Sequence, residues 1–147
     1  MQFARASRLA STAALIAVAA VALPAAGSSS GRAATGTKAY RVTERDFGIS
    51  APKSVTAGDL TLTVRNYGPD QHELIIVRTD RARLPLRSDG LTVDEETLQK
   101  RTIEALEPSP AGDVHRLHLH LAAGRYVLFC NMAGHYLGGM HTMLVVR

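Results

Sequence analysis

YVLFCNMAGHYLGGMHTMLVV, residues 126–146, is the stretch on which the interpretation of the whole sequence depends. It contains two apolar runs, Tyr126–Cys130 and Thr142–Val146, each with the length and composition of a buried β-strand. Between the runs lies a segment with three glycines, which permit tight backbone turns. The stretch therefore predicts two strands joined by a loop that begins at Cys130.

This loop also carries side chains that bind metals. His135 follows Cys130 after four intervening residues, and Met140 follows His135 after four more. A fourth candidate, His72, stands at the start of the apolar run His72–Thr79. Two imidazoles, one thiolate and one weak thioether are the ligand set of a blue-copper site. We expect His72, Cys130, His135 and Met140 to bind one copper ion that cycles between Cu(II) and Cu(I).

Each of these residues also has a plainer interpretation. Taken alone, Cys130 would be a buried inert thiol and His135 an ordinary loop histidine. Met132 and Met143 compete with Met140 as the thioether, but Met132 is only two residues from Cys130 and Met143 belongs to the last strand. Zinc would more readily take a second thiolate or a carboxylate than a methionine. The single cysteine excludes an internal disulfide.

Most of the remaining chain alternates between apolar and polar residues, with the period of a β-strand. The further strands that we expect are Tyr40–Phe47, Ile49–Val55, 60–64, Glu73–Thr79 and Val114–Leu121. Turn residues separate these runs, most densely at Asn66–Asp70. Many short strands with turns between them predict an all-β fold, a Greek-key sandwich or barrel.

One segment departs from the strand period. We expect a short helix near 93–106, inside a long connection over residues 80–110. Thr92 and Glu95 have the spacing of a capping box, and Pro108 would end the helix. Such an insertion would either cover one sheet or contact a partner.

The N-terminal residues have the composition of a secretory signal. Arg5 and Arg8 precede the apolar run Ala13–Leu23, which is short for a membrane span, and small residues follow Pro24. The expected organisation is a leader over residues 1–27, a flexible tether over 28–38 and one folded domain over 39–147. An uncleaved leader would instead anchor the domain near a membrane. We expect a periplasmic, cell-surface or extracellular location.

Charge and motifs exclude several functions. The chain of 147 residues has a formal net charge of +4, of which three arginines among residues 1–34 account for +3. The nearly neutral remainder gives no electrostatic reason to expect nucleic-acid binding. The sequence has no phosphate-binding loop, no H-E-x-x-H and no C-x-x-C. We expect a monomer without enzymatic activity.

The residues around Cys130 resemble those of the cupredoxins, the blue type-1 copper proteins that include plastocyanin, azurin, rusticyanin and sulfocyanin. The C-x4-H-x4-M spacing is similar to that of the longer-loop members, and His72 follows the Asn66–Asp70 turn as the family layout implies. The resemblance extends over about residues 40–147. It implies a cupredoxin-like domain that transfers single electrons between redox proteins. An alternative is a copper carrier or sequestration protein with the same ligands.

The resemblance further implies that His135 lies near the surface in an apolar patch, for which Tyr136, Leu137 and the Gly138–Gly139 backbone are candidates. One residue departs from the family pattern. Many members have asparagine directly after the first ligand histidine, where this sequence has Glu73. That asparagine ties the two ligand segments together, so Glu73 puts the surroundings of the metal in question.

Two more histidines occupy one face of an expected strand. His118 and His120 alternate with the leucines of Val114–Leu121, which places them on the solvent face. A second metal site at these histidines is the less favoured alternative.

Overall fold

The structure is a computed structural model that describes residues 36–81 and 83–147. The predicted leader and most of the predicted tether lie outside this part of the chain. Within it, no helix combines the length and the apolar character that crossing a membrane requires. The first strand begins at Lys38, the last residue of the predicted tether.

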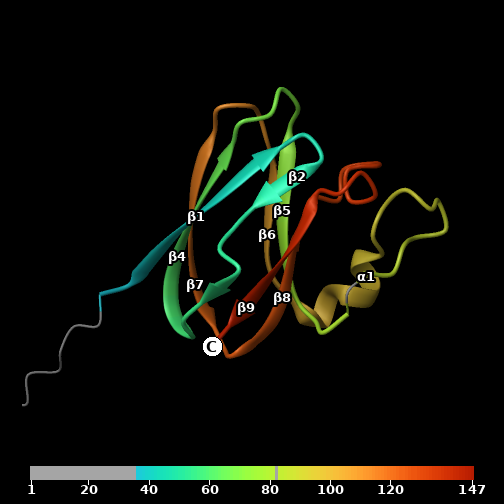
Figure 1. The fold of residues 1–147 in the computed structure, drawn as a ribbon. Coiled ribbons are helices and arrows are strands. Elements are labelled where there is room, and N and C mark those ends of the chain that lie inside the picture. The colour runs from blue at the N-terminus through green and yellow to red at the C-terminus, as the bar shows by residue number, and fades with distance from the viewer. Residues whose placement is uncertain (1–35, 82) are drawn as a thin grey trace, which may run out of the picture. The chain divides into compact units, whose positions relative to one another are not determined.

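The described residues form two β-sheets that face each other (Figure 1). The first sheet has the strand order β2-β1-β4-β7 and the second the order β3-β9-β8-β5-β6. The strands of the first sheet are β1 (Lys38–Arg45), β2 (Gly48–Ser50), β4 (Gly58–Asn66) and β7 (Val114–Leu121). Those of the second are β3 (Ser54–Val55), β5 (His72–Arg78), β6 (Thr102–Ser109), β8 (Gly124–Phe129) and β9 (His141–Val146). The predicted all-β Greek-key sandwich is confirmed.

Strand pairing is antiparallel except for β1 with β4 and β3 with β9, which are parallel. The strand predicted over Ile49–Val55 is divided into β2, in the first sheet, and β3, in the second. The other predicted strands are present, with ends that differ by at most two residues. The chain therefore passes from the first sheet to the second between β2 and β3.

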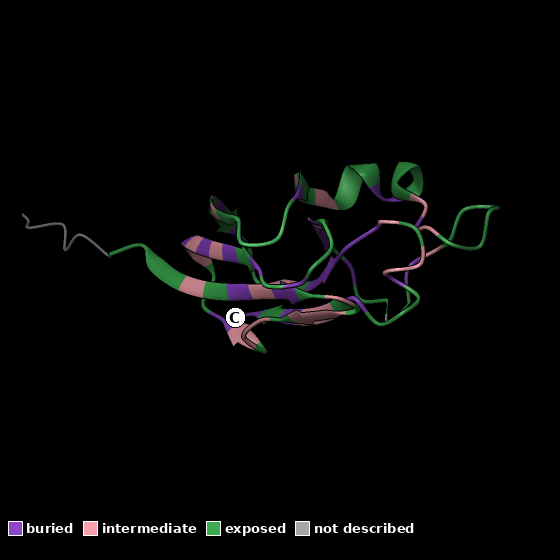
Figure 2. Cartoon of the chain, turned by 90° about the horizontal axis from the view of Figure 1, so that it is seen from above, coloured by how far each residue is buried: buried purple, intermediate pink, exposed green. Residues whose placement is uncertain are grey.

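The main core fills the space between the sheets. In β4 the inward residues Leu60, Leu62 and Val64 are buried, and the residues between them are more exposed. Figure 2 shows this alternation along the strands. Tyr126 and Leu128 of β8 meet the β4 side chains from the second sheet. Apolar burial of this kind is the main stabilising contribution to a sandwich.

A second apolar cluster lies on the outer face of the five-stranded sheet. Ile75 and Val77 of β5 pack there with Leu84, Val93 and Leu98 of the long connection. The long connection thus covers one sheet, which was one of the two roles expected for it. Because β5 is buried on both faces, its sequence is continuously apolar rather than alternating.

The helix predicted over 93–106 is wrong in extent. The helix α1 covers only Glu95–Leu98, a 3-10 turn, η1, follows at Gln99–Arg101, and β6 begins at Thr102. Asp94, not Thr92, caps α1, since its carboxylate accepts a hydrogen bond from the backbone N–H of Thr97.

In a helix over 93–106 the apolar residues Leu98, Ile103 and Leu106 would share one face, and this face does not form. Leu106 pairs with Leu74 of β5, and Ile103 is 41% exposed. Pro108, the predicted end of the helix, lies within β6 at the edge of the sheet, where a missing N–H is tolerated. Pairing with the apolar strand β5 therefore outweighs the local helical signal.

Candidate metal centre

The sheet itself brings His72 and Cys130 together. β5 begins at His72, and β8 ends at Phe129, one residue before Cys130. The two strands are antiparallel neighbours, with Ile75 opposite Phe129. The start of β5 and the end of β8 therefore lie side by side at the same end of the sheet.

The loop from Cys130 to Met140 is held by its own backbone. The N–H of Cys130 donates to the carbonyl of Met140 at 3.1 Å, and the N–H of Met140 donates to the carbonyl of His135 at 2.9 Å. A further bond runs from the N–H of Gly138 to the carbonyl of Gly134. Gly134 and Gly139 have positive φ angles, +80° and +106°, which favour glycine. The loop thus folds back so that both its ends meet.

These elements gather three of the predicted ligands into one cluster. One ligand atom from each of His72, Cys130 and His135 lies within 4.8 Å of the other two. The Cys130 Sγ is 3.5 Å from Nδ1 of His135, and the two imidazole centroids are 5.2 Å apart. Met140, fully buried, completes the predicted set through its place at the end of the loop.

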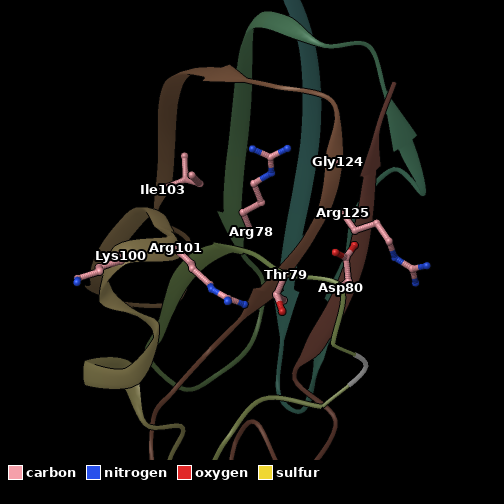
Figure 3. A pocket seen from close by; sticks show the side chains of 8 residues that line it. All are labelled: Arg78, Thr79, Asp80, Lys100, Arg101, Ile103, Gly124 and Arg125. Carbon is pink, nitrogen blue, oxygen red and sulfur yellow. The ribbon is translucent and has the colours of Figure 1, made fainter.

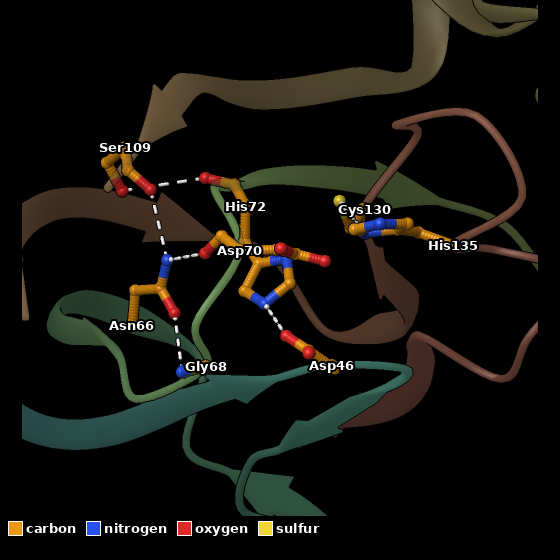
Figure 4. Close-up of polar contacts among 8 residues, drawn as sticks. All are labelled: Asp46, Asn66, Gly68, Asp70, His72, Ser109, Cys130 and His135. Atoms are coloured by element: carbon orange, nitrogen blue, oxygen red, sulfur yellow. Dashed lines mark hydrogen bonds and ion pairs between the residues drawn. The ribbon is translucent and has the colours of Figure 1, made fainter. Parts of the chain in front are cut away.

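The ring of His72 is oriented for a ligand. Its Nε2 lies 3.1 Å from Oδ1 of Asp46 (Figure 4), so the neutral ring donates its proton to that carboxylate. Its Nδ1 is buried and has no hydrogen-bond partner among the described residues. A buried lone pair without a partner is costly unless something binds it. Nδ1 of His72 therefore fits a metal, with Asp46 fixing the tautomer.

Burial favours the uncharged forms of Cys130 and His72 in the absence of a cation. Burial raises the pKa of the Cys130 thiol from 9.0 to about 11. Hydrogen bonds from the backbone of Glu73 and Met132 oppose this shift, and the charges of Glu73 and Glu44 add to it. Burial also lowers the pKa of His72, and the neighbouring His135 lowers it further. A thiol, two imidazoles and a thioether suit a soft or borderline transition metal, which must displace the thiol proton on binding.

Comparison with known proteins gives a fold. No protein-family model matches the chain, and no curated protein sequence matches it. Solved structures do match, among them the reduced auracyanin of Roseiflexus castenholzii, with a TM-score of 0.58 and 22% identity over 76% of this chain and 98% of that one.

The chain has the cupredoxin fold.

Two other solved structures agree. Auracyanin A of Chloroflexus aurantiacus, described as a "blue" copper protein, has a TM-score of 0.54 and 19% identity over 76% of this chain and all of that one, 100%. Rusticyanin of Thiobacillus ferrooxidans has a TM-score of 0.54 and 16% identity over 75% of this chain and 78% of that one.

In this cupredoxin fold Glu73 links the two ligand segments. Its Oε1 accepts a hydrogen bond of 2.8 Å from the backbone N–H of Asn131, the residue after Cys130. Burial raises the pKa of Glu73. The sequence left open whether Glu73 could replace the asparagine that ties the two ligand segments together in many cupredoxins. The carboxyl group of Glu73 makes such a connection.

Asn131 extends this link to the long connection. Its side-chain Nδ2 donates to the carbonyl of Val93 at 3.0 Å and to Oε1 of Glu95 at 2.6 Å. The long connection, including the start of α1, is thereby attached to the loop that carries Cys130 and His135.

The hairpin β1–β2 supplies groups that sequence reasoning missed. Glu44 is fully buried, and neither carboxylate oxygen has a hydrogen-bond partner among the described residues. Burial raises its pKa from 4.5 to about 7, and the charge of Glu73 adds to the shift. One signal was available, since Glu44 has the same inward phase as Val42. Asp46 left no comparable signal.

The surface beside His135 differs from the prediction. Tyr136 is 6% exposed rather than part of a surface patch, and its hydroxyl accepts a hydrogen bond from the N–H of Leu84 at 2.9 Å. The exposed apolar side chains are Leu137 and Phe47, at 51% and 54%. The Phe47 ring lies 5.5 Å from the His135 ring and covers Gly138, where a Cβ would meet it.

His118 and His120 are on the solvent face, as predicted. Nδ1 of His118 lies 3.0 Å from Oγ1 of Thr61, and Nδ1 of His120 lies 2.7 Å from Oδ1 of Asp59. In the described part of the chain, the only cluster of three or more His, Cys, Asp or Glu ligand atoms is that of His72, Cys130 and His135.

Proposed function

We propose that this protein is a one-electron carrier with a single copper ion bound by His72, Cys130, His135 and Met140. The main support is the cluster of ligand atoms from His72, Cys130 and His135, which lie within 4.8 Å of one another. In addition, Nδ1 of His72 is buried and has no hydrogen-bond partner among the described residues. When bound, copper would supply Cu(II)/Cu(I) chemistry, for which this mixed soft and imidazole donor set is suited. The fold shared with auracyanin and rusticyanin supports the same conclusion.

The chain's own residues favour electron transfer over catalysis. Four protein ligands leave no open position for a substrate, which catalytic metal sites require. His72 and Cys130 are fully buried, whereas His135 is only partly so. The edge of the His135 ring, next to the exposed Phe47, is therefore the path by which an electron would leave. Redox proteins would be the partners of a monomeric carrier.

The test is the visible spectrum of the purified protein after addition of Cu(II). We expect an intense blue band that is absent in Cys130→Ser, because the band requires the thiolate, and that ascorbate bleaches. Met132→Leu is the matched control, since Met132 lies on the same loop but outside the proposed set, and it should keep the band.

The other outcomes separate the alternatives. Copper binding without a blue band, with rapid release of Cu(I) to a competing chelator, would favour the carrier or sequestration function. Absence of copper binding would refute both.

Leu137→Asp should slow electron self-exchange between the oxidised and reduced protein by about tenfold, since a charge at this exposed apolar position, two residues after His135, opposes apolar contact and repels the same charge on a second copy. Line broadening in NMR spectra of partly oxidised samples measures the rate. Val145→Asp, at an exposed apolar position on β9, is the control. An unchanged rate in Leu137→Asp, with an unchanged spectrum, would place the electron path elsewhere.

Export from the cytoplasm is a further part of the proposal. It is supported by the basic residues, short apolar run and small residues of the first 27 positions. The intact mass of the protein isolated from its own cells should correspond to a chain without this leader. A mass equal to the full 147 residues would instead favour an uncleaved anchor.

A further inference from the structure

A basic hollow lies at the opposite end of the five-stranded sheet from the metal centre. It has a volume of about 480 Å³ and is lined by residues of β5, η1, β6 and β8 (Figure 3). β5 runs from His72 at the metal centre to Arg78 at the hollow. Six residue steps in a strand span roughly 20 Å, so the two sites are separate.

The hollow concentrates positive charge. Its lining includes four cations, Arg78, Lys100, Arg101 and Arg125, and one acid, Asp80. Its formal charge is thus +3, whereas residues 35–147 together carry +1. In the described chain, none of these cations forms an ion pair with an aspartate or glutamate within 4.0 Å, because the ion pairs found there all involve histidines. The charge is therefore available to a ligand.

Two of the arginines define the hollow. Arg78 is held in place, since its Nη2 donates to the carbonyl of Ala123 at 2.8 Å. Its guanidinium lies against Gly124, where a Cβ would come within 3.0 Å of Nε. From the other side Arg101 extends from η1 toward Thr79 (Figure 3). Lys100 and Arg125 point outward at the rim and add to the local potential.

We propose that this hollow binds a phosphate oxyanion that carries two or more negative charges. Guanidinium groups match the geometry of phosphate oxygens with paired N–H donors, and one such group is fixed before binding. The volume suits a small phosphorylated molecule or the headgroup of an anionic lipid. The site would act independently of copper, because it shares no residue with the metal cluster.

Inorganic pyrophosphate is the probe, followed by amide NMR shifts of the ascorbate-reduced, copper-loaded protein and of the metal-free protein. We expect saturable shifts at Thr79, Arg101 and Gly124 in both forms. Arg101→Gln should weaken binding by about tenfold, the loss expected for one charged hydrogen-bond donor, and Arg125→Gln should weaken it less. Arg116→Gln, at an exposed position on β7 of the other sheet, should bind as the wild type does.

Two results would overturn the proposal. One is the absence of saturable shifts, and the other is an equal loss of affinity in Arg116→Gln and Arg101→Gln, which would indicate diffuse attraction. Copper binding is not needed for the metal-free measurement, so failure of the proposed electron-transfer function would leave this result unaffected.

Vesicles that contain phosphatidic acid, a phosphomonoester lipid whose headgroup can carry two negative charges, identify the source of the phosphate. Cosedimentation that pyrophosphate blocks and that Arg101→Gln abolishes would assign the site to a lipid headgroup. Pyrophosphate binding without cosedimentation would assign it to a soluble phosphate.

Discussion

Gly68→Ala should weaken copper binding by about 10- to 100-fold, the range for loss of a contact that orients a metal ligand. A Cβ at this position would lie 2.5 Å from Oδ1 of Asp46 and 2.6 Å from Nε2 of His72. These are the two atoms whose contact orients the His72 ring. The new methyl group would therefore force the carboxylate and the imidazole away from each other.

The turn around Gly68 has little freedom to move away. The N–H of Gly68 donates to Oδ1 of Asn66, and Nδ2 of Asn66 donates to the carbonyls of Asp70 and Ser109 (Figure 4). A Cβ would also come within 3.1 Å of the backbone N of Asp46. Overpacking at such a site commonly lowers the free energy of unfolding by about 1–3 kcal/mol.

Competition with a chelator of known affinity measures the change in copper binding, and urea unfolding measures the change in stability. Gly48→Ala is the matched control, because a Cβ at Gly48 would meet nothing within 4 Å. Wild-type copper affinity in Gly68→Ala would show that the Asp46–His72 contact does not orient the ligand.

Glu44→Gln should stabilise the metal-free protein by about 3 kcal/mol at pH 8 and by little at pH 5. The pKa of Glu44 rises from 4.5 to about 7 in the folded protein, so the folded state binds the proton more tightly than the unfolded state. Each unit of pKa difference between the folded and unfolded states corresponds to about 1.4 kcal/mol. The free energy of unfolding of the wild type therefore falls as the pH rises from 4.5 through 7. Glutamine carries no proton to lose and avoids the cost.

Urea unfolding at a series of pH values from 5 to 8 checks this prediction. The difference between Glu44→Gln and wild type cancels the titrating groups that do not interact with Glu44, and it reports Glu44 together with its coupling to Glu73. Glu96→Gln, at an exposed position of α1, should leave the pH dependence unchanged. A constant difference between Glu44→Gln and wild type across the series would show that Glu44 is not protonated by burial.

The sequence allowed the metal cluster to be predicted because its parts are local. Cys130, His135 and Met140 share one loop, and the flanking apolar runs mark where that loop begins and ends. His72 was predicted from its place at the start of an apolar run, after the Asn66–Asp70 turn, as the cupredoxin resemblance implies. Alternation and buried apolar runs were enough to place most strands, since each reports how a strand is buried.

The remainder depends on tertiary contacts that no local pattern encodes. The residues after Arg101 carry helical spacing, yet they complete the sheet because β5 needs a partner on its open edge. Asp46 and Phe47 reach the cluster only because the β1–β2 hairpin packs against the ligand loop. Tyr136 looked like a surface residue but is covered by the long connection.

The closure of the ligand loop by main-chain bonds has a consequence for how this protein can change. The backbone of Met140 is positioned by its own amide and carbonyl, through His135 and Cys130. Another residue at position 140 would be delivered to the same place, while His72 stays fixed at the end of its strand. A single codon change at position 140 can therefore replace the proposed fourth donor without altering the backbone bonds that hold the loop, so that selection or design can adjust the strength of this ligand without rebuilding the scaffold.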